Sequence, residues 1–425
     1  LSLIVESHSP FNPTQLNLLK NIGARVQYRY DRIHSISVRI PLNRIVNLAK
    51  YAFIKKIWSD GQSNLAINDN NIMQTGADAT QKFGVIGKNV RVAIIDTGID
   101  HSHSEFEGRI IAKRGNRDPS HWHGTHVAGI IGASDDGEGM TGIAPGVSLI
   151  DAPIIPRRFW YQGEYADTID AINWAADSVS ADIINISMGW GPWEYDRNGL
   201  DPMSRTIDLI VSEGKCVVVV AAGNSSEQYD QGVATQHPEQ GKVWIYQHDI
   251  EVAGTMQVTL WWKGKNSDLD LVLENNSGEE IISSRTHRVF GWFGRPRGQT
   301  MYGAYYEQII YRPQMPRKLK VRVEAYFVPE NQTYEIWLDE NARFLNVNED
   351  QKSKTITVPG YAEHAITVGA INIDDESIAA FSSRGPSEHQ FPLIKPEVVS
   401  LGGVSNNSEL GIYSTMWNNS YGYAA

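Results

Sequence analysis

Three histidines stand close together in the segment SHWHGTHVAG, Ser120 to Gly129. They are His121, His123 and His126. Zinc sites on a helix use histidines at positions i and i+4 with a glutamate between them. Here the spacings are two and three, Gly124 intervenes, and the segment contains no glutamate. A metal cage is one interpretation. The competing interpretation is a catalytic base at a helix start, with Gly124 admitting close approach and His126 packed inside.

A histidine that acts as a general base needs a carboxylate to orient it. Asp96 supplies one, because it ends the apolar run VRVAIID and is followed by Thr97 and Gly98. Acyl transfer also needs a donor to the developing oxyanion, and the amide of Asn224, at the end of VVVVAAGN, suits that role. Loss of such an amide costs ~10²–10³ in turnover. The candidate catalytic residues are therefore Asp96, His123 and Asn224.

These residues must be positioned by the elements that carry them. From about residue 75, apolar runs such as VRVAIID, ADIINIS and KCVVVVAA alternate with stretches of helical periodicity. That alternation predicts a parallel sheet with helices on both faces, an α/β fold. Ligands of such sheets bind beyond the carboxyl ends of the strands, where Asp96 and Asn224 are expected.

Five segments together resemble the subtilisin-like serine proteases, the subtilases: IIDTGID, HGTHVAG, INISMG, AAGN and FSSRGP. The resemblance covers about 75 to 225 and 355 to 425. It implies that Asp96 orients His123, that His123 is general base and then general acid, and that Asn224 is the oxyanion donor. It also implies two walls that hold the substrate backbone. They are Ser187, Met188 and Gly189 on one side, and Ala221, Ala222 and Gly223 on the other. Tight packing at strand ends explains the glycines equally well.

The nucleophile that this family requires is a serine in a Gly-Thr-Ser-x-Ala-x-Pro segment, and these 425 residues contain no such segment. Ser420 lies in NNSYGYAA, which lacks the Gly-Thr before it and the proline after it. The closing YGYAA resembles the family stretch that runs into the nucleophile. We therefore expect the serine on a truncated remainder or on a separate C-terminal fragment. The alternative is a catalytically inactive subtilase-fold protein with a binding or regulatory role.

Calcium is the cofactor that the resemblance implies. The segment SDDGEGM matches the position of a family calcium loop, and Glu105 falls where the family often has a carboxylate ligand. Calcium takes oxygen ligands from carboxylates and backbone carbonyls. Asp136 is the best side-chain ligand of the loop, although an acidic surface turn is the alternative. The candidate metal ligands are Glu105, Ser134, Asp136, Glu138 and Met140.

The first 62 residues predict a separate small domain. LSLIVES, ARVQYRYDRI, HSISVRIP and FIKKIWSD have the pattern of strands, and PTQLNLLKNIG and LNRIVNLAKYA that of helices. Their βαββαβ order is the ferredoxin-like arrangement. The domain also resembles the subtilase propeptide, an intramolecular chaperone and inhibitor whose tail passes along the active site. The junction with the mature enzyme is expected within the polar stretch 59–70.

Residues 226–353 interrupt the α/β pattern with β-type stretches only, which predicts an inserted antiparallel β-sandwich. Asp268 and Asp270 in NSDLDLVL are either a second metal site or outward-facing residues of a strand. Aromatic residues crowd 289–306 and form either core or an exposed binding patch. The insertion either restricts access to the active site or braces the enzyme. The catalytic domain is then 63–225 with 354–425.

Composition excludes several function classes. The net charge of −11 argues against a general nucleic-acid surface, because phosphate contacts need basic patches. The single cysteine, Cys216, excludes an internal disulfide and lies in an apolar run, as a buried inert thiol would. No segment approaches the ~20 apolar residues of a membrane span. The chain starts at Leu1 without methionine, so a removed signal peptide and a secreted endopeptidase zymogen acting on proteins or peptides are expected.

Overall fold

The computed structural model divides the chain into two compact units. One comprises Leu1–Gly223 and Ile356–Ala425, and the other Asn224–Thr355. The predicted insertion 226–353 lies within the second unit. The structure describes residues 2–41, 44–59, 63–65, 75–135, 140–154, 165–191, 197–234, 244–263, 267–284, 294–299, 305–328, 331–339, 341–346, 352–373, 375–387, 392–403 and 411–424.

The N-terminal part of the first unit is a four-stranded antiparallel sheet in the order β2-β3-β1-β4. Its elements are β1 (Ser2–Ser7), α1 (Pro13–Asn21), β2 (Arg25–Tyr30), a 3-10 turn (Asp31–Ile33), β3 (Ser35–Arg39), α2 (Ile45–Leu48) and β4 (Ile54–Ser59). The chain enters α1 through a capping box, in which Asn12 and Gln15 satisfy each other's backbone N–H groups. The apolar faces of the strands and of α1 share one core. The βαββαβ order agrees with the sequence pattern, although α2 is shorter than its periodicity suggests.

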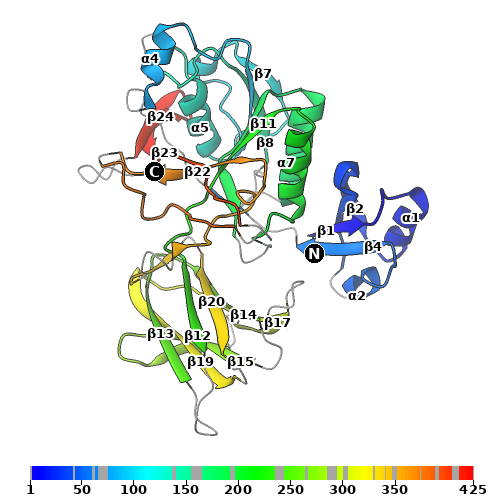
Figure 1. The fold of residues 1–425 in the computed structure, drawn as a ribbon, viewed down its shortest axis with the longest axis vertical. Coiled ribbons are helices and arrows are strands. Elements are labelled where there is room, and N and C mark those ends of the chain that lie inside the picture. The colour runs from blue at the N-terminus through cyan, green and yellow to red at the C-terminus, as the bar shows by residue number, and fades with distance from the viewer. Residues whose placement is uncertain are drawn as a thin grey trace. The chain divides into compact units, whose positions relative to one another are not determined.

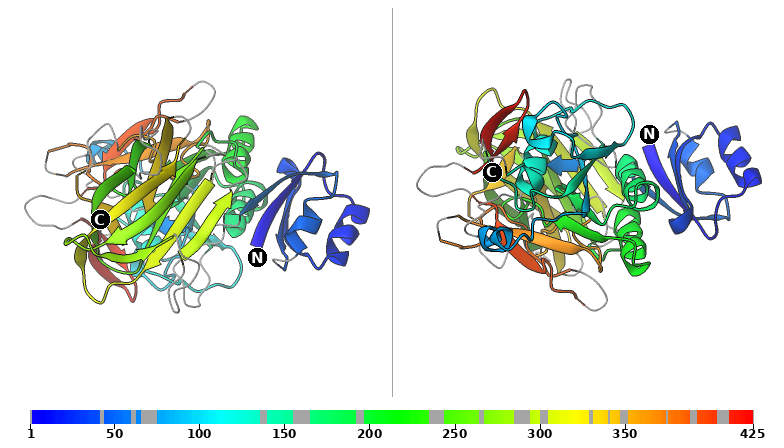
Figure 2. Two further views of the ribbon diagram at one scale, coloured as in Figure 1. Left: turned by 90° about the horizontal axis from the view of Figure 1, so that it is seen from below. Right: turned by 90° about the horizontal axis from the view of Figure 1, so that it is seen from above.

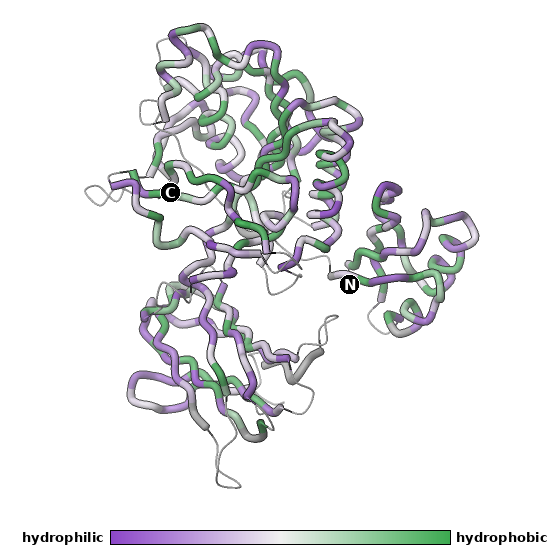
Figure 3. The backbone as a smooth tube through the Cα atoms, in the orientation of Figure 1, coloured by the Kyte–Doolittle hydropathy of each residue, from purple (hydrophilic) through white to green (hydrophobic). Residues whose placement is uncertain are grey.

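The central part of the first unit is a seven-stranded parallel sheet, which confirms the predicted α/β class (Figure 1). Its strands are β6 (Arg91–Asp96), β7 (Ile110–Lys113), β8 (Ser148–Pro153), β9 (Ile183–Ile186), β11 (Val217–Ala221), β22 (Ile366–Ile371) and β23 (Val398–Leu401). They lie in the order β23-β22-β11-β9-β6-β8-β7. The last two strands therefore come from the part of the chain after the second unit. Figure 3 shows that these strands are mainly hydrophobic, as is typical of the strands of a parallel sheet.

Helices lie on both sides of this sheet (Figures 1 and 2). They are α4 (Ala77–Lys82), α5 (His123–Gly132), α6 (Tyr165–Asn173) and α7 (Pro202–Ser212). Val127 and Ala128 of α5 pack against Val92 and Ile94 of β6. At the start of α7, the side chain of Asp201 accepts hydrogen bonds from the backbone N–H groups of Met203 and Ser204 and so caps the helix.

Two short strands and one hairpin complete the first unit. Strand β5 (Ser63–Leu65) pairs antiparallel with β10 (Met188–Trp190). Strand β24 (Ile412–Met416) pairs with β25 (Ser420–Ala424) and packs against α5. The contact is close, because a Cβ on Gly129 of α5 would lie 2.3 Å from the hydroxyl of Thr415.

The second unit consists of two five-stranded antiparallel sheets in the orders β12-β20-β14-β18-β17 and β16-β15-β19-β13-β21. Their strands are β12 (Tyr229–Ala234), β13 (Trp244–Val252), β14 (Met256–Trp262), β15 (Asp268–Glu274), β16 (Glu280–Ser283), β17 (Gly294–Gln299), β18 (Tyr305–Tyr311), β19 (Arg317–Phe327), β20 (Gln332–Leu338) and β21 (Ala342–Phe344). Side chains from both sheets share a single hydrophobic core.

Two predictions fall on strands of this unit. Asp268 is exposed and Asp270 half-buried, whereas Leu269 and Leu271 between and after them are fully buried. This alternation is that of a strand with one face on the core. Of the crowded aromatic residues, Tyr305 packs against the core and Tyr306 against Trp261. The others lie outside the described residues: Phe290, Trp292, Phe293 and Tyr302.

Candidate active site

Asp96 and His123 meet at the carboxyl edge of the parallel sheet. Asp96 is the last residue of β6, and His123 is the first residue of α5. The Nδ1 atom of His123 lies 2.7 Å from Oδ1 of Asp96, and both side chains are buried. This hydrogen bond fixes the orientation of the imidazole ring, as a general base requires.

Thr97 fastens the strand end to the helix start. Its hydroxyl donates to the carbonyl of His121 at 2.9 Å and accepts from the backbone N–H of Gly124 at 2.8 Å. Gly124 is required by the closeness of the two segments, because a Cβ there would lie 2.6 Å from the carbonyl oxygen of Gly98. The predicted close approach at Gly124 is therefore observed, and Thr97 has a positioning role that the sequence analysis missed.

The three histidines have separate environments. His121 is half-buried between the rings of Trp122 and Trp417. Burial, with a smaller contribution from His123, lowers the pKa of His121. His126 is fully buried, and one of its ring nitrogens lies 3.1 Å from the carbonyl of Ile412 in β24. Burial lowers the pKa of His126 to about 4, so the imidazole is neutral and packs the helix against the hairpin. Among the described residues, no group of three or more His, Cys, Asp or Glu side chains is placed to hold a metal ion.

The predicted substrate edge follows β9 directly. Ser187 is buried and its hydroxyl accepts a hydrogen bond from the side-chain amide of Asn185. Met188 and Gly189 begin β10, one edge of which pairs with β5. The other edge of β10 is bridged to Val358 through Trp190. This strand therefore has the extended backbone that can bind a peptide by main-chain hydrogen bonds.

The opposite wall, Ala221 to Gly223, is the end of β11 and the two residues after it. Ala222 and Gly223 are held through their carbonyls by the backbone N–H groups of Thr357 and Ser383. Thr357 also explains why two residues of the predicted walls, Gly189 and Gly223, are glycines. A Cβ on Gly189 would lie 2.0 Å from its hydroxyl, and one on Gly223 2.5 Å from its side chain. The two walls are thus packed against the same residue.

Asn224 directly follows Gly223 and is the first residue of the second compact unit. Asn224 therefore follows the carboxyl end of β11 by three residues in the sequence. Its role as oxyanion donor remains a prediction.

The candidate calcium ligands are only partly described. The carboxylate of Glu105 is buried and accepts hydrogen bonds from the backbone N–H of Ser134 at 2.8 Å and the hydroxyl of Tyr421 at 2.7 Å. The guanidinium of Arg109 donates to the carbonyl of Glu105 and to the hydroxyl of Ser134. Because Glu105 and Ser134 have these partners and a fixed positive charge beside them, their described contacts do not fit a divalent ion.

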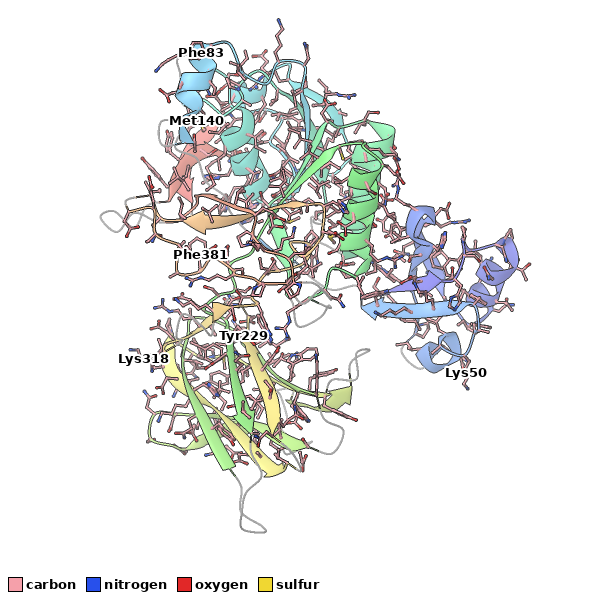
Figure 4. The ribbon with its side chains drawn as sticks, viewed as in Figure 1. Lys50, Phe83, Met140, Tyr229, Lys318 and Phe381 are labelled. Atoms are coloured by element: carbon pink, nitrogen blue, oxygen red, sulfur yellow. The ribbon has the colours of Figure 1, made fainter. Side chains whose placement is uncertain are left out.

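The remaining candidates lie in the segment after Ser134. Asp136 and Glu138 lie outside the described residues, and Met140 is half-buried (labelled in Figure 4). Calcium therefore stays a prediction from the resemblance.

Comparison with known proteins gives matches that include this site. A model of the subtilase family matches residues 87–262 and 339–424, which contain Asp96, His123 and Asn224. The Major intracellular serine protease of Bacillus subtilis (strain 168) is 30% identical over 218 residues, which cover 49% of this chain and 64% of that protein. Subtilisin E of the same strain is 30% identical over 215 residues, which cover 49% of this chain and 54% of that protein. The chain thus spans less than two thirds of either relative.

Among solved structures, the CspB protease of Clostridium perfringens has a TM-score of 0.59. The match covers 84% of this chain and 83% of that chain at 19% sequence identity. At this identity the likeness concerns the fold. The family match, by contrast, extends over more than half of the present chain and includes both members of the buried aspartate–histidine pair.

Proposed function

The chain belongs to the subtilase family, and from that premise we propose that it is the larger part of a serine endopeptidase zymogen. The observation that carries this proposal is the buried 2.7 Å hydrogen bond between Asp96 and His123. In the proposed reaction Nε2 of His123 takes the proton of a serine hydroxyl as that oxygen attacks a peptide carbonyl. Asp96 stabilises the imidazolium that forms, and His123 then protonates the leaving amine. Proteins or peptides are the proposed substrates.

We place the serine outside these 425 residues. Ser420, the tempting candidate, begins β25, where its hydroxyl donates to the carbonyl of Trp417 at 2.6 Å. Its own carbonyl lies 2.9 Å from a ring nitrogen of His103. The hydroxyl of Ser420 is thus bonded within the hairpin and its carbonyl to His103, and neither contact involves His123.

Exposed apolar residues on the face of the parallel sheet that α5 covers are the second argument for a serine-bearing segment outside these 425 residues. Val92 of β6 is buried under α5. It lies opposite Ile183 of β9, which lies opposite Val217 of β11, so Val92 and Val217 point to the same face of the sheet. Val217 is 44% exposed, and two further residues of that face, Ile366 and Val398, are 40% and 49% exposed. A parallel sheet normally has both faces covered. Within the described part of the chain this half of the face lacks a helix, as it would if the serine-bearing segment packed there.

The N-terminal sheet is proposed to be the inhibitory propeptide. Tyr28 of β2 donates a hydrogen bond to Asp167 of α6 at 2.9 Å, and Tyr30 donates to the carbonyl of Ala166 at 2.7 Å. Arg32 binds both Asp177 and Glu213. These contacts dock the sheet on α6 and α7 while β5, which follows it, lies along the substrate edge. Because β5 is paired with β10, other peptides are excluded from this edge of β10.

The second candidate function is a catalytically inactive subtilase-fold protein that binds or regulates another protein. The two candidates differ in one measurement, covalent labelling by a serine-directed fluorophosphonate. The 425-residue chain alone should not react. The protein made from its complete coding sequence should react, and His123→Ala should abolish the reaction. Labelling of the 425-residue chain at Ser420 would contradict the placement of the nucleophile, and no labelling of the complete protein would favour the inactive candidate.

Two further experiments address the propeptide and the localisation. Residues 1–62, added to the completed enzyme after removal of its own N-terminal sheet, should inhibit peptide hydrolysis. The secreted state is also a proposal, and one relative is by its name intracellular. Fractionation of the producing cells distinguishes a secreted protein from an intracellular one. No helix among the described residues is long and apolar enough to span a membrane.

A further inference from the structure

The first turn of α5, which carries His123, is capped by side chains from outside the helix. The residue at the N-cap position, Trp122, makes no side-chain hydrogen bond to the helix. The backbone N–H of Gly124 instead donates to the hydroxyl of Thr97 at 2.8 Å. The backbone N–H of His123 donates to the Nδ1 atom of His121 at 3.3 Å. The first N–H groups of a helix have no acceptor within it, so the imidazole of His121 acts as a cap at His123.

This hydrogen bond determines the protonation state of His121. A backbone N–H group can only donate, so Nδ1 of His121 must have a free lone pair, and the proton of the neutral ring is then on Nε2. When the ring binds a second proton, Nδ1 becomes a donor and no longer accepts from the backbone of His123. The cap therefore exists only while His121 is neutral.

The surroundings of His121 favour the neutral ring. The ring centres of Trp122 and Trp417, which carry no charge, lie 4.7 and 6.3 Å from the centre of the imidazole. Burial lowers the pKa of His121 and His123 lowers it further, while the nearby Asp96 acts in the opposite direction. A positive charge is also unfavourable at the start of a helix, where the peptide dipoles create a positive potential. His123 and Asp96 are thus the ionisable groups to which the protonation of His121 is coupled.

We propose that His121 is a positioning residue for His123, and that it gives up this role when its own imidazole is protonated. As the pH falls, a proton from water binds Nδ1 of His121 and the hydrogen bond to the backbone of His123 breaks. The start of α5 then loses one of the contacts that hold it beside Asp96. Two protonations therefore stop the enzyme in acid: the one on His123 removes the base, and the one on His121 displaces it. The effect on turnover rests on the proposed protease function, whereas the cap itself does not.

The first test follows the backbone N–H of His123 by NMR in the 425-residue chain labelled with ¹⁵N-histidine, between about pH 4 and 8. The loss of one amide signal in His123→Gln assigns it. In the wild type this signal should shift in two steps, one for each of the coupled imidazoles. In His121→Asn it should shift in a single step, because the asparagine carbonyl accepts the same hydrogen bond but does not titrate. A single step in the wild type would overturn the proposal.

A comparison at neutral pH tests the cap without acid. Exchange of the His123 amide with solvent should be similar in the wild type and in His121→Asn. In His121→Leu, which fills a similar space but has no acceptor, the exchange should be at least about tenfold faster. Circular dichroism confirms that each variant is folded. Equal exchange in all three folded proteins would overturn the cap.

The second test measures kcat/KM of the complete protein against pH, because this ratio reports the ionisations of the free enzyme. The acid limb of log(kcat/KM) should have a slope of about two in the wild type and about one in His121→Asn. His364→Asn, which removes an exposed histidine of the same unit, is the control and should keep the wild-type slope. At neutral pH, His121→Leu should lower kcat roughly tenfold and change KM little, since the base is displaced but the substrate walls are intact.

The outcomes separate this inference from the proposed function. An active enzyme whose wild-type slope is about one would overturn the role of His121 and leave the protease function standing. A complete protein without peptidase activity, but with a two-step titration of the His123 amide, would reject the protease function and support the cap. Absence of both the activity and the second step would overturn both.

Discussion

The carboxylate of Glu6 in β1 accepts a hydrogen bond at 2.7 Å from the guanidinium of Arg205 in α7, although 199 positions separate the two residues. Lys55 donates to the same oxygen, also at 2.7 Å. The Glu6 side chain is 3% exposed, so the carboxylate is buried between two cations where the N-terminal sheet meets the parallel-sheet part of the first unit. This pair links the proposed inhibitor to α7 of the parallel-sheet part.

Replacing Glu6 with glutamine should weaken that link. Burial by itself raises the pKa of Glu6, but the hydrogen bonds from Lys55 and Arg205 outweigh it, and the net pKa is lowered from 4.5. The stabilisation is therefore full above pH 4.5 and is lost as the pH falls through the lower pKa of the folded state. At neutral pH we expect Glu6→Gln to cost about 1–3 kcal/mol in the free energy of unfolding, measured with urea.

The matched control for Glu6→Gln is Asp78→Asn, which breaks the exposed pair between Asp78 and Lys82 within α4. Exposed pairs contribute little to stability, so this variant should unfold like the wild type. Equal urea midpoints for Glu6→Gln and the wild type would contradict the role assigned to Glu6.

Thr97 is expected to matter for both stability and turnover. Thr97→Val keeps the shape of the side chain but removes one donor and one acceptor at a buried site, which should cost about 1–3 kcal/mol. Displacement of the start of α5 should also lower kcat of the completed enzyme roughly tenfold to a hundredfold. Thr80→Val, which removes a hydroxyl bonded within α4, is the control. An unchanged kcat in Thr97→Val would refute the positioning role.

His126 should make the protein sensitive to mild acid. Burial depresses its pKa from 6.5 to about 4, so the unfolded chain binds a proton that the folded chain does not. Its contribution to stability is therefore complete above pH 6.5 and declines by about 3 kcal/mol as the pH falls to 4. Urea unfolding from pH 4 to 7.5 should show a flatter pH dependence for His126→Asn than for the wild type. His8→Asn controls for replacement of an exposed histidine, and parallel pH curves for all three proteins would reject the assignment.

Calcium, proposed from the resemblance, is tested by melting curves. A ligand that binds only the folded state at a hundred times its Kd adds about 2.7 kcal/mol to stability. If the loop 134–140 binds calcium, millimolar calcium should raise Tm and chelation should lower it. Asp136→Asn should abolish this response, whereas Asp135→Asn at the neighbouring position should retain it. Melting curves that coincide in calcium and in chelator would reject the site.

The sequence by itself determined the order of the elements and the identity of the candidate catalytic pair. Strand and helix patterns are local, so they predicted the βαββαβ segment and the parallel strands. Asp96 and His123 were recognisable because each stands at the end of an element whose type the neighbouring residues determine.

Only the tertiary structure decided the contacts between distant segments. The packing of Thr357 against Gly189, the ion pair of Glu6 with Arg205 and the register of β5 on β10 join residues more than a hundred positions apart. No local pattern encodes such contacts, because they depend on how whole elements pack once their apolar faces are buried. The register is the clearest case: a slip of one residue leaves the sequence of Ser63–Leu65 unchanged but changes which residue lies opposite Met188.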